Sequence, residues 1–137
     1  KLYLLGGNDM TIAEVSKKFE LTIDTLRYYE RIGLIPSVPR TKGGIRDYGE
    51  NECNWIEFIK CMRAAGLPVE ALIEYVGLFQ AGEQTVEARK EILTEQRKLL
   101  AARIDEMKQT LNRLDYKIEV YEKCVVKNEK TLRQKEQ

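Results

Sequence analysis

The sequence of 137 residues predicts a mainly α-helical protein, a winged helix-turn-helix unit followed by a long C-terminal coiled-coil helix. Three observations support this fold class: two short helical patterns joined by a tight turn, a basic hairpin-like stretch after them, and an apolar heptad repeat that continues almost to the end of the chain. The predicted parts are a leader at 1–9, the winged unit at 10–81, the coiled-coil helix at 82–128 and a tail at 129–137.

The composition limits the functions that the chain can have. Charged residues make up 33% and apolar residues 43%, the net charge is only +1, and there is no histidine. Without imidazole, Ser-His triads and zinc sites that need a His ligand are excluded, so we expect no enzyme activity, no metal and no cofactor. Three cysteines do not form a disulfide framework, and no apolar run approaches the roughly 18 residues that cross a bilayer. The sequence therefore predicts a cytoplasmic protein that does not enter a membrane.

The first two helices are predicted from their caps. Thr11 and Glu14 have the spacing of a capping box, so a helix is expected from there to about Phe19. After a short turn, Thr22 caps a second helix that ends near Ile32, where a glycine follows. Two short helices joined by so tight a turn form a helix-turn-helix unit.

A basic wing follows the helix pair. In RTKGGIRDY, residues 40–48, Gly43-Gly44 is expected to form a two-residue turn between short strands. Residues 25–46 carry five basic side chains against one acid, Glu30. Positive charge is therefore concentrated beside the tyrosines of the second helix.

Two further helices are expected between the wing and the long helix. One spans about 50–65, and a second is opened by Pro68 and ends near a hinge at Ala81-Gly82. The inner face of the first is expected to carry Trp55, Ile59 and Met62.

The long helix carries a heptad stripe over about five heptads, which would extend about 66 Å. The small N-terminal unit cannot bury such a stripe, so a second chain is expected to cover it. The predicted dimerisation residues are Leu93, Leu100, Ile104, Met107, Leu111, Leu114, Ile118, Tyr121 and Val125.

The second helix has the side chains of a DNA-reading helix. Arg27, Tyr28 and Arg31 are expected to face solvent, where guanidinium groups bind phosphates or guanine edges and a tyrosine hydroxyl binds a phosphate. In a winged unit this helix enters the major groove, and the wing lies along the backbone or the minor groove. The sequence thus predicts a DNA-binding dimer.

Three motifs, in this order and spacing, resemble the MerR family of bacterial transcription regulators: TIAEVSKKFELTIDTLRYYERIGLI, RTKGGIRDY and WIEFIKCMRAAGLPVEALIEYV. The resemblance covers Met10 to about Asn128. It implies a homodimer joined by an antiparallel coiled coil, which binds a pseudo-palindromic promoter and distorts it so that RNA polymerase can engage. The DNA-contacting positions that it implies are Thr22, Arg27, Tyr28, Tyr29, Arg40, Lys42, Arg46 and Tyr48, with Lys18 and Arg63 as further phosphate contacts. The alternative is an excisionase-like architectural protein that bends DNA without an effector.

Cys61 is the candidate effector site. Paired cysteines, as in the metal sensors of the family, do not follow the long helix here, whereas FIKCMRAAG is similar to the branch that answers aldehydes and other electrophiles. The flanking Lys60 and Arg63 favour the reactive thiolate. An adduct at Cys61 is expected to add volume to a packed layer and so rotate the DNA-reading units. The opposing interpretation is that Cys61 is a small apolar residue in a packed helix.

Overall fold

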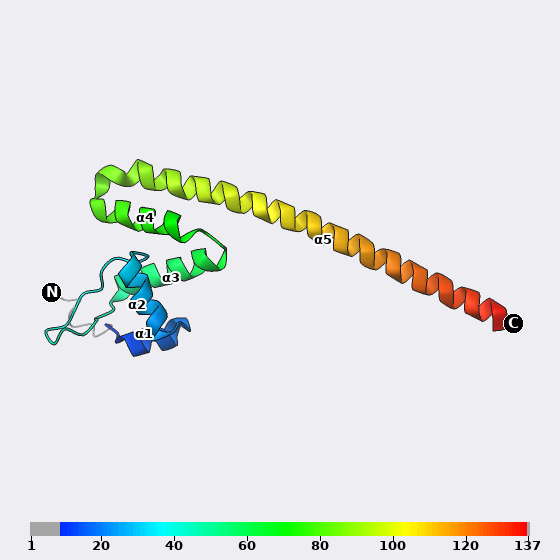
Figure 1. Ribbon diagram of the computed structural model, residues 1–137, viewed down its shortest axis with the longest axis horizontal. Helices are drawn as coiled ribbons and strands as arrows, with labels where there is room; N and C mark the ends of the chain where they lie inside the picture. Colours follow the sequence, from blue (N-terminus) through cyan, green and yellow to red (C-terminus); the bar gives the residue numbers. More distant parts are fainter. Residues whose placement is uncertain (1–8, 137) are drawn as a thin grey trace. The chain divides into compact units, whose positions relative to one another are not determined.

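The computed structural model describes residues 9–136 and contains only helices as regular elements in that range (Figure 1). The predicted leader lies outside the described residues, except for Asp9. The chain forms two compact units, one ending at Gln96 and one beginning at Arg97. The elements are α1 (Ile12–Phe19), α2 (Ile23–Ile32), α3 (Glu50–Ala64), α4 (Val69–Ala81), the 3-10 helix η2 (Glu83–Thr85) and α5 (Val86–Glu136).

Side-chain caps define the helix-turn-helix as the sequence predicts. The Thr11 hydroxyl accepts from the Glu14 amide at 3.2 Å, and the Glu14 carboxylate accepts from the Thr11 amide at 2.9 Å. The Thr22 hydroxyl accepts from the Thr25 amide at 3.0 Å and so caps α2. Gly33 ends α2 with φ of 86°, a left-handed conformation that glycine adopts without strain. The predicted bounds of α1 and α2 are confirmed.

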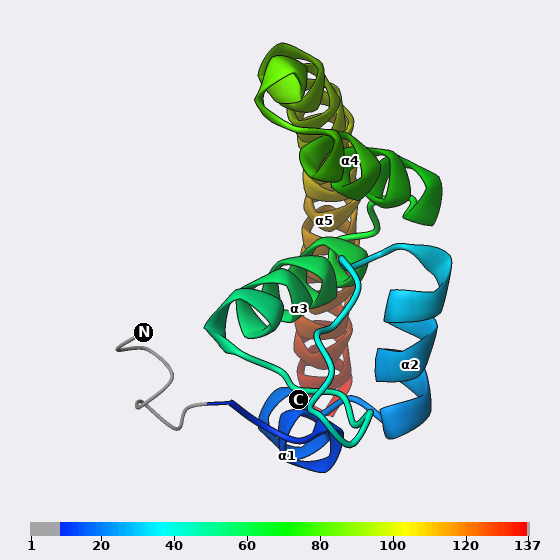
Figure 2. The ribbon, with the colours of Figure 1, turned by 90° about the vertical axis from the view of Figure 1, so that its left-hand side faces the viewer.

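The core of the first unit lies where α1, α2, α3 and the wing meet. The views in Figures 1 and 2 place α1 and α2 side by side, with α3 against them. The side chains that are almost fully buried there come from all of these elements and from α4: Val15, Leu26, Leu34, Ile35, Tyr48, Ile56, Ile59 and Leu72. Of the predicted inner face of α3, Ile59 is buried, while Trp55 and Met62 are half-buried at the edge of the core.

The predicted two-stranded wing is wrong in its details. Its described residues form only two isolated bridges, Met10 with Tyr48 and Arg40 with Arg46. The turn is also longer than predicted, because the Gly44 amide donates to the Thr41 carbonyl at 2.9 Å and the Thr41 amide donates to the Ile45 carbonyl at 2.7 Å. A loop held by so few backbone bonds depends on side chains for its position.

The connection from α4 to α5 is a tight corner. Gly82 has φ of 115°, and the Thr85 hydroxyl lies 2.6 Å from the Leu78 carbonyl. The guanidinium of Arg89 lies over the Phe79 ring, 5.3 Å from its centroid, so the start of α5 packs against the end of α4.

The long helix extends beyond its predicted end. α5 has 51 residues and runs to Glu136, so most of the predicted tail is helical. Most of the predicted dimerisation stripe is exposed in the single chain, including Met107 at 71% and Leu111 at 57%. None of the helices within residues 9–136 combines the length and the apolar character that a bilayer-spanning helix needs.

Candidate nucleic-acid interface

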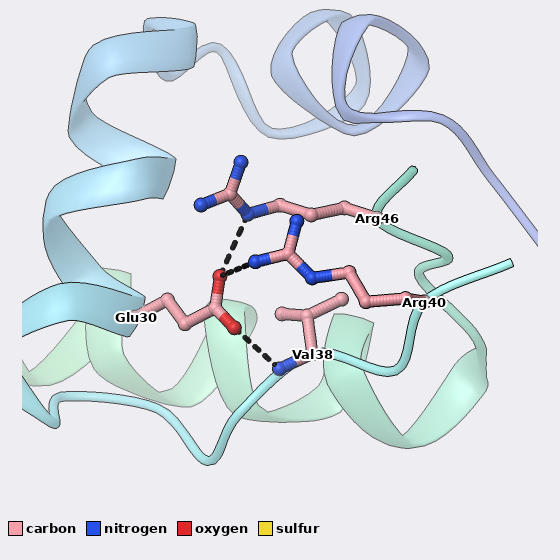
Figure 3. Close-up of polar contacts among 4 residues, drawn as sticks. All are labelled: Glu30, Val38, Arg40 and Arg46. Atoms are coloured by element: carbon pink, nitrogen blue, oxygen red, sulfur yellow. Dashed lines mark hydrogen bonds and ion pairs between the residues drawn. The ribbon is translucent and has the colours of Figure 1, made fainter. Parts of the chain in front are cut away.

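A single carboxylate attaches the wing to α2 (Figure 3). One oxygen of Glu30 accepts from the backbone amide of Val38 at 2.8 Å, and the other accepts from Nε of Arg46 at 2.7 Å. A guanidinium nitrogen of Arg40 lies 3.7 Å from the second oxygen. The Glu30 side chain is only 11% exposed. Glu30 therefore binds the segment that enters the wing and both of its sides at once; we call this group the Glu30 clamp.

The environment of Glu30 favours its charged form. Burial alone would raise its pKa, but the hydrogen bonds from Arg46 and Val38 and the charges of Arg46 and Arg40 outweigh that effect, so the pKa lies below its usual value of 4.5. Because the folded pKa is the lower one, the clamp stabilises the fold fully above the unfolded pKa and loses this contribution as the pH falls through the folded pKa.

This arrangement predicts an acid-sensitive wing. Glu30→Gln should lower the free energy of unfolding by about 1.5–3 kcal/mol at pH 7, the typical loss for hydrogen bonds to a charged group. The difference from wild type should begin to shrink below about pH 4.5, where Glu30 of the unfolded chain takes up a proton, and it should be lost as the pH falls through the lower pKa of the folded state. Urea unfolding at matched protein concentration, followed from pH 7 to pH 3, measures both effects. Asp24→Asn is the matched control, because Asp24 is 96% exposed on the same helix; an equal loss in both variants would contradict the role of the clamp.

The outward face of α2 carries the predicted DNA-reading side chains. Tyr28 is 41% exposed, and the Arg31 guanidinium lies 5.5 Å from the centroid of its ring. Arg27 is half exposed, and its nearest carboxylate, Asp24, is 3.8 Å away. These cationic and aromatic side chains face solvent and are not buried in the core. A surface that binds DNA needs such accessible side chains.

The wing adds a second exposed basic segment. Lys42 is exposed at its tip, next to Ile45, whose side chain is 62% exposed. Gly44 has φ of 79°, which allows the chain to reverse at this point without strain. Arg40 and Arg46 lie behind the tip and are partly occupied by the Glu30 clamp. The structure thus brings α2 and the wing together through Glu30.

Two predicted DNA contacts lie in the core instead. Tyr48 is fully buried, and its backbone pairs with Met10 in both directions at 2.7 Å and 2.9 Å. Burial raises the pKa of the Tyr48 hydroxyl, which does not reach the surface; its prediction as a DNA contact is wrong. Tyr29 is 7% exposed, so its ring lies in the core, and burial is the main reason that its pKa is raised.

The outlying predicted contacts already have structural partners. Thr22 uses its hydroxyl as the cap of α2, and Arg63 donates to the Leu67 carbonyl at 2.7 Å. The ammonium of Lys18 lies 5.4 Å from the centroid of the Phe19 ring. Lys18 and Thr22 are exposed on the helix-turn-helix, so their phosphate contacts stay predictions, as does that of Arg63.

Cys61 lies at the surface of α3, so the expectation that an adduct would enter a packed layer of the single chain is wrong. Its flanking cations are held elsewhere: Lys60 donates to the Phe19 carbonyl and Arg63 to the Leu67 carbonyl. Cys53 is buried and Cys124 is exposed. The position of Cys61 makes it accessible to small reagents, and it also rules out the interpretation as core filler within this chain.

The sequence interpretation missed Glu30 as a site residue. Glu30 was counted only as the single acid in a basic segment, and a lone acid among five bases is itself the signal of a buried partner for arginine. The exposed Ile45 at the tip of the wing was also not singled out.

Comparison with known proteins shows which family the chain resembles. The chain matches the MerR HTH family regulatory protein model over residues 10–77 and the "MerR, DNA binding" model over residues 54–116. It is 64% identical over 91 residues to the HTH-type transcriptional regulator AdhR of Bacillus subtilis (strain 168), a match that covers 66% of this chain and 65% of that protein. The alignment therefore spans slightly less than two thirds of the length of AdhR.

Two solved structures share the fold. A protein from Listeria monocytogenes assigned to the MerR family of transcriptional regulators is 46% identical, with a TM-score of 0.87, and the match covers 91% of this chain and 95% of that one. HiNmlR, a MerR family regulator lacking the sensor domain and bound to promoter DNA, is 28% identical, with a TM-score of 0.77 and coverage of 84% and 91%. With its capped helix pair, its wing and its long heptad helix, the chain belongs to the MerR family of helix-turn-helix transcriptional regulators.

Proposed function

We propose that this MerR-type regulator binds a pseudo-palindromic promoter as a homodimer in the bacterial cytoplasm and distorts the DNA so that RNA polymerase can engage it. The observation that carries the proposal is the Glu30 clamp, which attaches the wing to α2 while Arg27 and Tyr28 of α2 and Lys42 of the wing face solvent. The DNA-bound state of HiNmlR, whose fold this chain shares, supports the same use of the surface here.

In this arrangement each part of the surface has a separate task. Arg27 and Tyr28 on α2 bind base edges or phosphates in the major groove. Lys42, at the tip of the wing, neutralises a backbone phosphate. The clamp sets the distance between these two contacts, because its hydrogen bond to Arg46 and its ion pair with Arg40 join α2 to both sides of the wing.

The exposed apolar stripe of α5 supports the homodimer. Side chains such as Met107, Leu111 and Leu114 are more than half exposed in the single chain, and a second α5 would cover them. A stripe of this length is also what distinguishes a dimeric regulator from the excisionase-like alternative, in which no second chain is needed.

The proposal is tested by salt-dependent DNA binding to the promoter of the chain's own gene. Lys42→Ala should weaken binding to specific and unrelated duplexes alike, and it should reduce the slope of log K against log salt by about one unit, the loss expected for one phosphate contact. Lys42 is a cleaner choice than Arg46, since Arg46 also holds Glu30. Lys98→Ala on α5 is the matched control. A wild-type protein with no salt-dependent affinity for the promoter would contradict the proposed function.

We further propose that Cys61 is the effector site and that the effector is a small electrophile such as formaldehyde. The support is the exposure of its thiol on α3 and the similarity of FIKCMRAAG to the electrophile-responsive branch of the family. The Cys61 sulfur adds to the carbonyl carbon, the C=O π bond becomes a C–O single bond, and the oxygen gains a proton in exchange for the thiol proton. The product is a hemithioacetal on the surface of α3, where it alters contacts between α3 and the other parts of the dimer.

Cys61→Ser should remove most of the transcriptional response to formaldehyde and leave promoter affinity unchanged, because serine preserves the shape but is a far weaker nucleophile. A promoter reporter gives the response, and mass spectrometry of the treated protein locates the adduct. Cys124→Ser controls for an exposed thiol on α5. A full response in the Cys61→Ser variant would overturn the assignment.

A further inference from the structure

The solvent-exposed face of α2 carries an acid among its cations. The structure describes every residue of α2, and the exposed side chains of this helix are those of Asp24, Arg27, Tyr28 and Arg31. The last three follow Asp24 by three, four and seven residues, so all four lie on one side of the helix, away from the buried Leu26. Asp24 therefore belongs to the surface that the proposed function places in the DNA groove.

The position of Asp24 favours an acid in the free protein but not beside a phosphate. Its side chain is 96% exposed and lies in the first turn of α2, where the positive end of the helix dipole stabilises a negative charge. In a complex with DNA the same carboxylate lies among phosphates, and like charges placed side by side lower the affinity. The carboxylate is compatible with tight binding only if a base donates a hydrogen bond to it.

The neighbouring polar groups leave the Asp24 oxygens able to accept such a bond. Nη1 of Arg27 lies 3.8 Å from Oδ1 of Asp24, which is close enough for an ion pair and too far for a hydrogen bond. The hydroxyls of Thr22 and Thr25 lie 2.8 Å apart, and the Thr22 hydroxyl also accepts from the Thr25 amide. The two threonines thus bond to each other, and the carboxylate beside them stays open to an outside donor.

The major groove offers a carboxylate only two kinds of donor. These are the N4 amino group of cytosine and the N6 amino group of adenine. The adenine amino group lies beside N7, an acceptor that repels a carboxylate, whereas cytosine presents no acceptor of its own in this groove. Recognition helices contact base edges with their N-terminal residues, and in α2 these include Asp24. Cytosine is therefore the base that fits Asp24.

We propose that Asp24 determines sequence specificity by accepting a hydrogen bond from the N4 amino group of one cytosine in each half-site. Arg27, one helical turn away on the same face, is placed to donate to O6 and N7 of a neighbouring guanine. The proposal rests on the proposed function, in which α2 enters the major groove, and it adds the base that this end of α2 selects. Asp24 also lowers the affinity for DNA without that cytosine, because its charge then faces phosphates with no compensating donor.

Selection from duplexes with randomised half-sites tests this assignment. Wild type should select a cytosine in each half-site, and replacing one of them should weaken binding about five- to tenfold, the effect of one base contact. Asp24→Ala should bind both duplexes equally and should bind unrelated DNA at least as tightly as wild type. Asp24→Asn should shift the preference toward adenine, whose N6 and N7 an amide binds together. Asp105→Ala removes an exposed acid of α5 and is the matched control, which should keep the cytosine preference. A cytosine preference that persists in Asp24→Ala would overturn the proposal.

A base analogue tests the contact at a single atom. Pyrimidin-2-one in place of the selected cytosine lacks the 4-amino group, and its effect on base pairing is common to all protein variants. Comparison of wild type with Asp24→Ala therefore isolates the contact. The analogue should weaken wild type about five- to tenfold more than Asp24→Ala, and equal weakening would overturn the proposal. A wild type that selects no sequence refutes the proposed function, whereas selective binding with an unchanged preference in Asp24→Ala refutes only the role of Asp24.

Discussion

Leu111→Asp is expected to abolish the dimer and promoter binding together. Leu111 is at the centre of the α5 stripe and is 57% exposed in the single chain, so the partner would cover it in the proposed dimer. Removal of a buried leucine side chain typically lowers the free energy of unfolding by about 2–5 kcal/mol, and a symmetric dimer loses two such side chains. Adding an unpaired carboxylate to the interface increases that cost further.

The two measurements are light scattering for mass and a titration of promoter DNA. Tyr116→Asp controls for the new charge, because Tyr116 is 68% exposed and lies outside the stripe. The first unit has its own core of α1 to α4, and we expect it to keep its helical structure in the Leu111→Asp variant. A Leu111→Asp protein that remains dimeric and binds the promoter with wild-type affinity would contradict the assignment of the stripe.

The helices could be predicted from the sequence because local signals determine them. Thr11, Thr22 and Gly33 define the caps of α1 and α2, and the structure contains each cap where the sequence predicts it. The heptad of α5 is also a local pattern. Its end was placed too early because Asn128 interrupts the stripe, although an asparagine in an exposed helix costs little and the helix continues to Glu136.

The wing could not be predicted as well, since contacts distant in sequence determine it. The Glu30 clamp joins residues up to 16 positions apart, and no local pattern shows that a carboxylate on α2 will bind Arg46. With the clamp present, the loop needs few backbone bonds, so the strands that the two glycines suggested do not form. Cys61 was misplaced for a related reason: on a helix of low amphipathicity, sequence alone does not tell which side faces the core.

Tyr48 is the residue for which sequence and structure lead to opposite expectations. As a DNA contact, it would need its hydroxyl, and Tyr48→Phe would weaken promoter binding. The structure buries the whole side chain, and the hydroxyl has no hydrogen-bond partner among the described residues. A buried, unpaired polar group destabilises a fold, so its removal should be neutral or stabilising.

We therefore expect Tyr48→Phe to retain wild-type promoter affinity and to unfold at the same or a higher urea concentration. Tyr48→Ala should lower the free energy of unfolding by about 3–5 kcal/mol, as is typical for truncation of a buried aromatic ring, because Tyr48 belongs to the same buried core cluster as Leu26 and Ile56. Urea unfolding and promoter titration of both variants separate the two effects. Since the Tyr48 backbone also pairs with Met10, loss of the ring should loosen the wing and reduce DNA affinity only through stability. Weakened binding by a stable Tyr48→Phe protein would mean that the hydroxyl reaches the DNA after all.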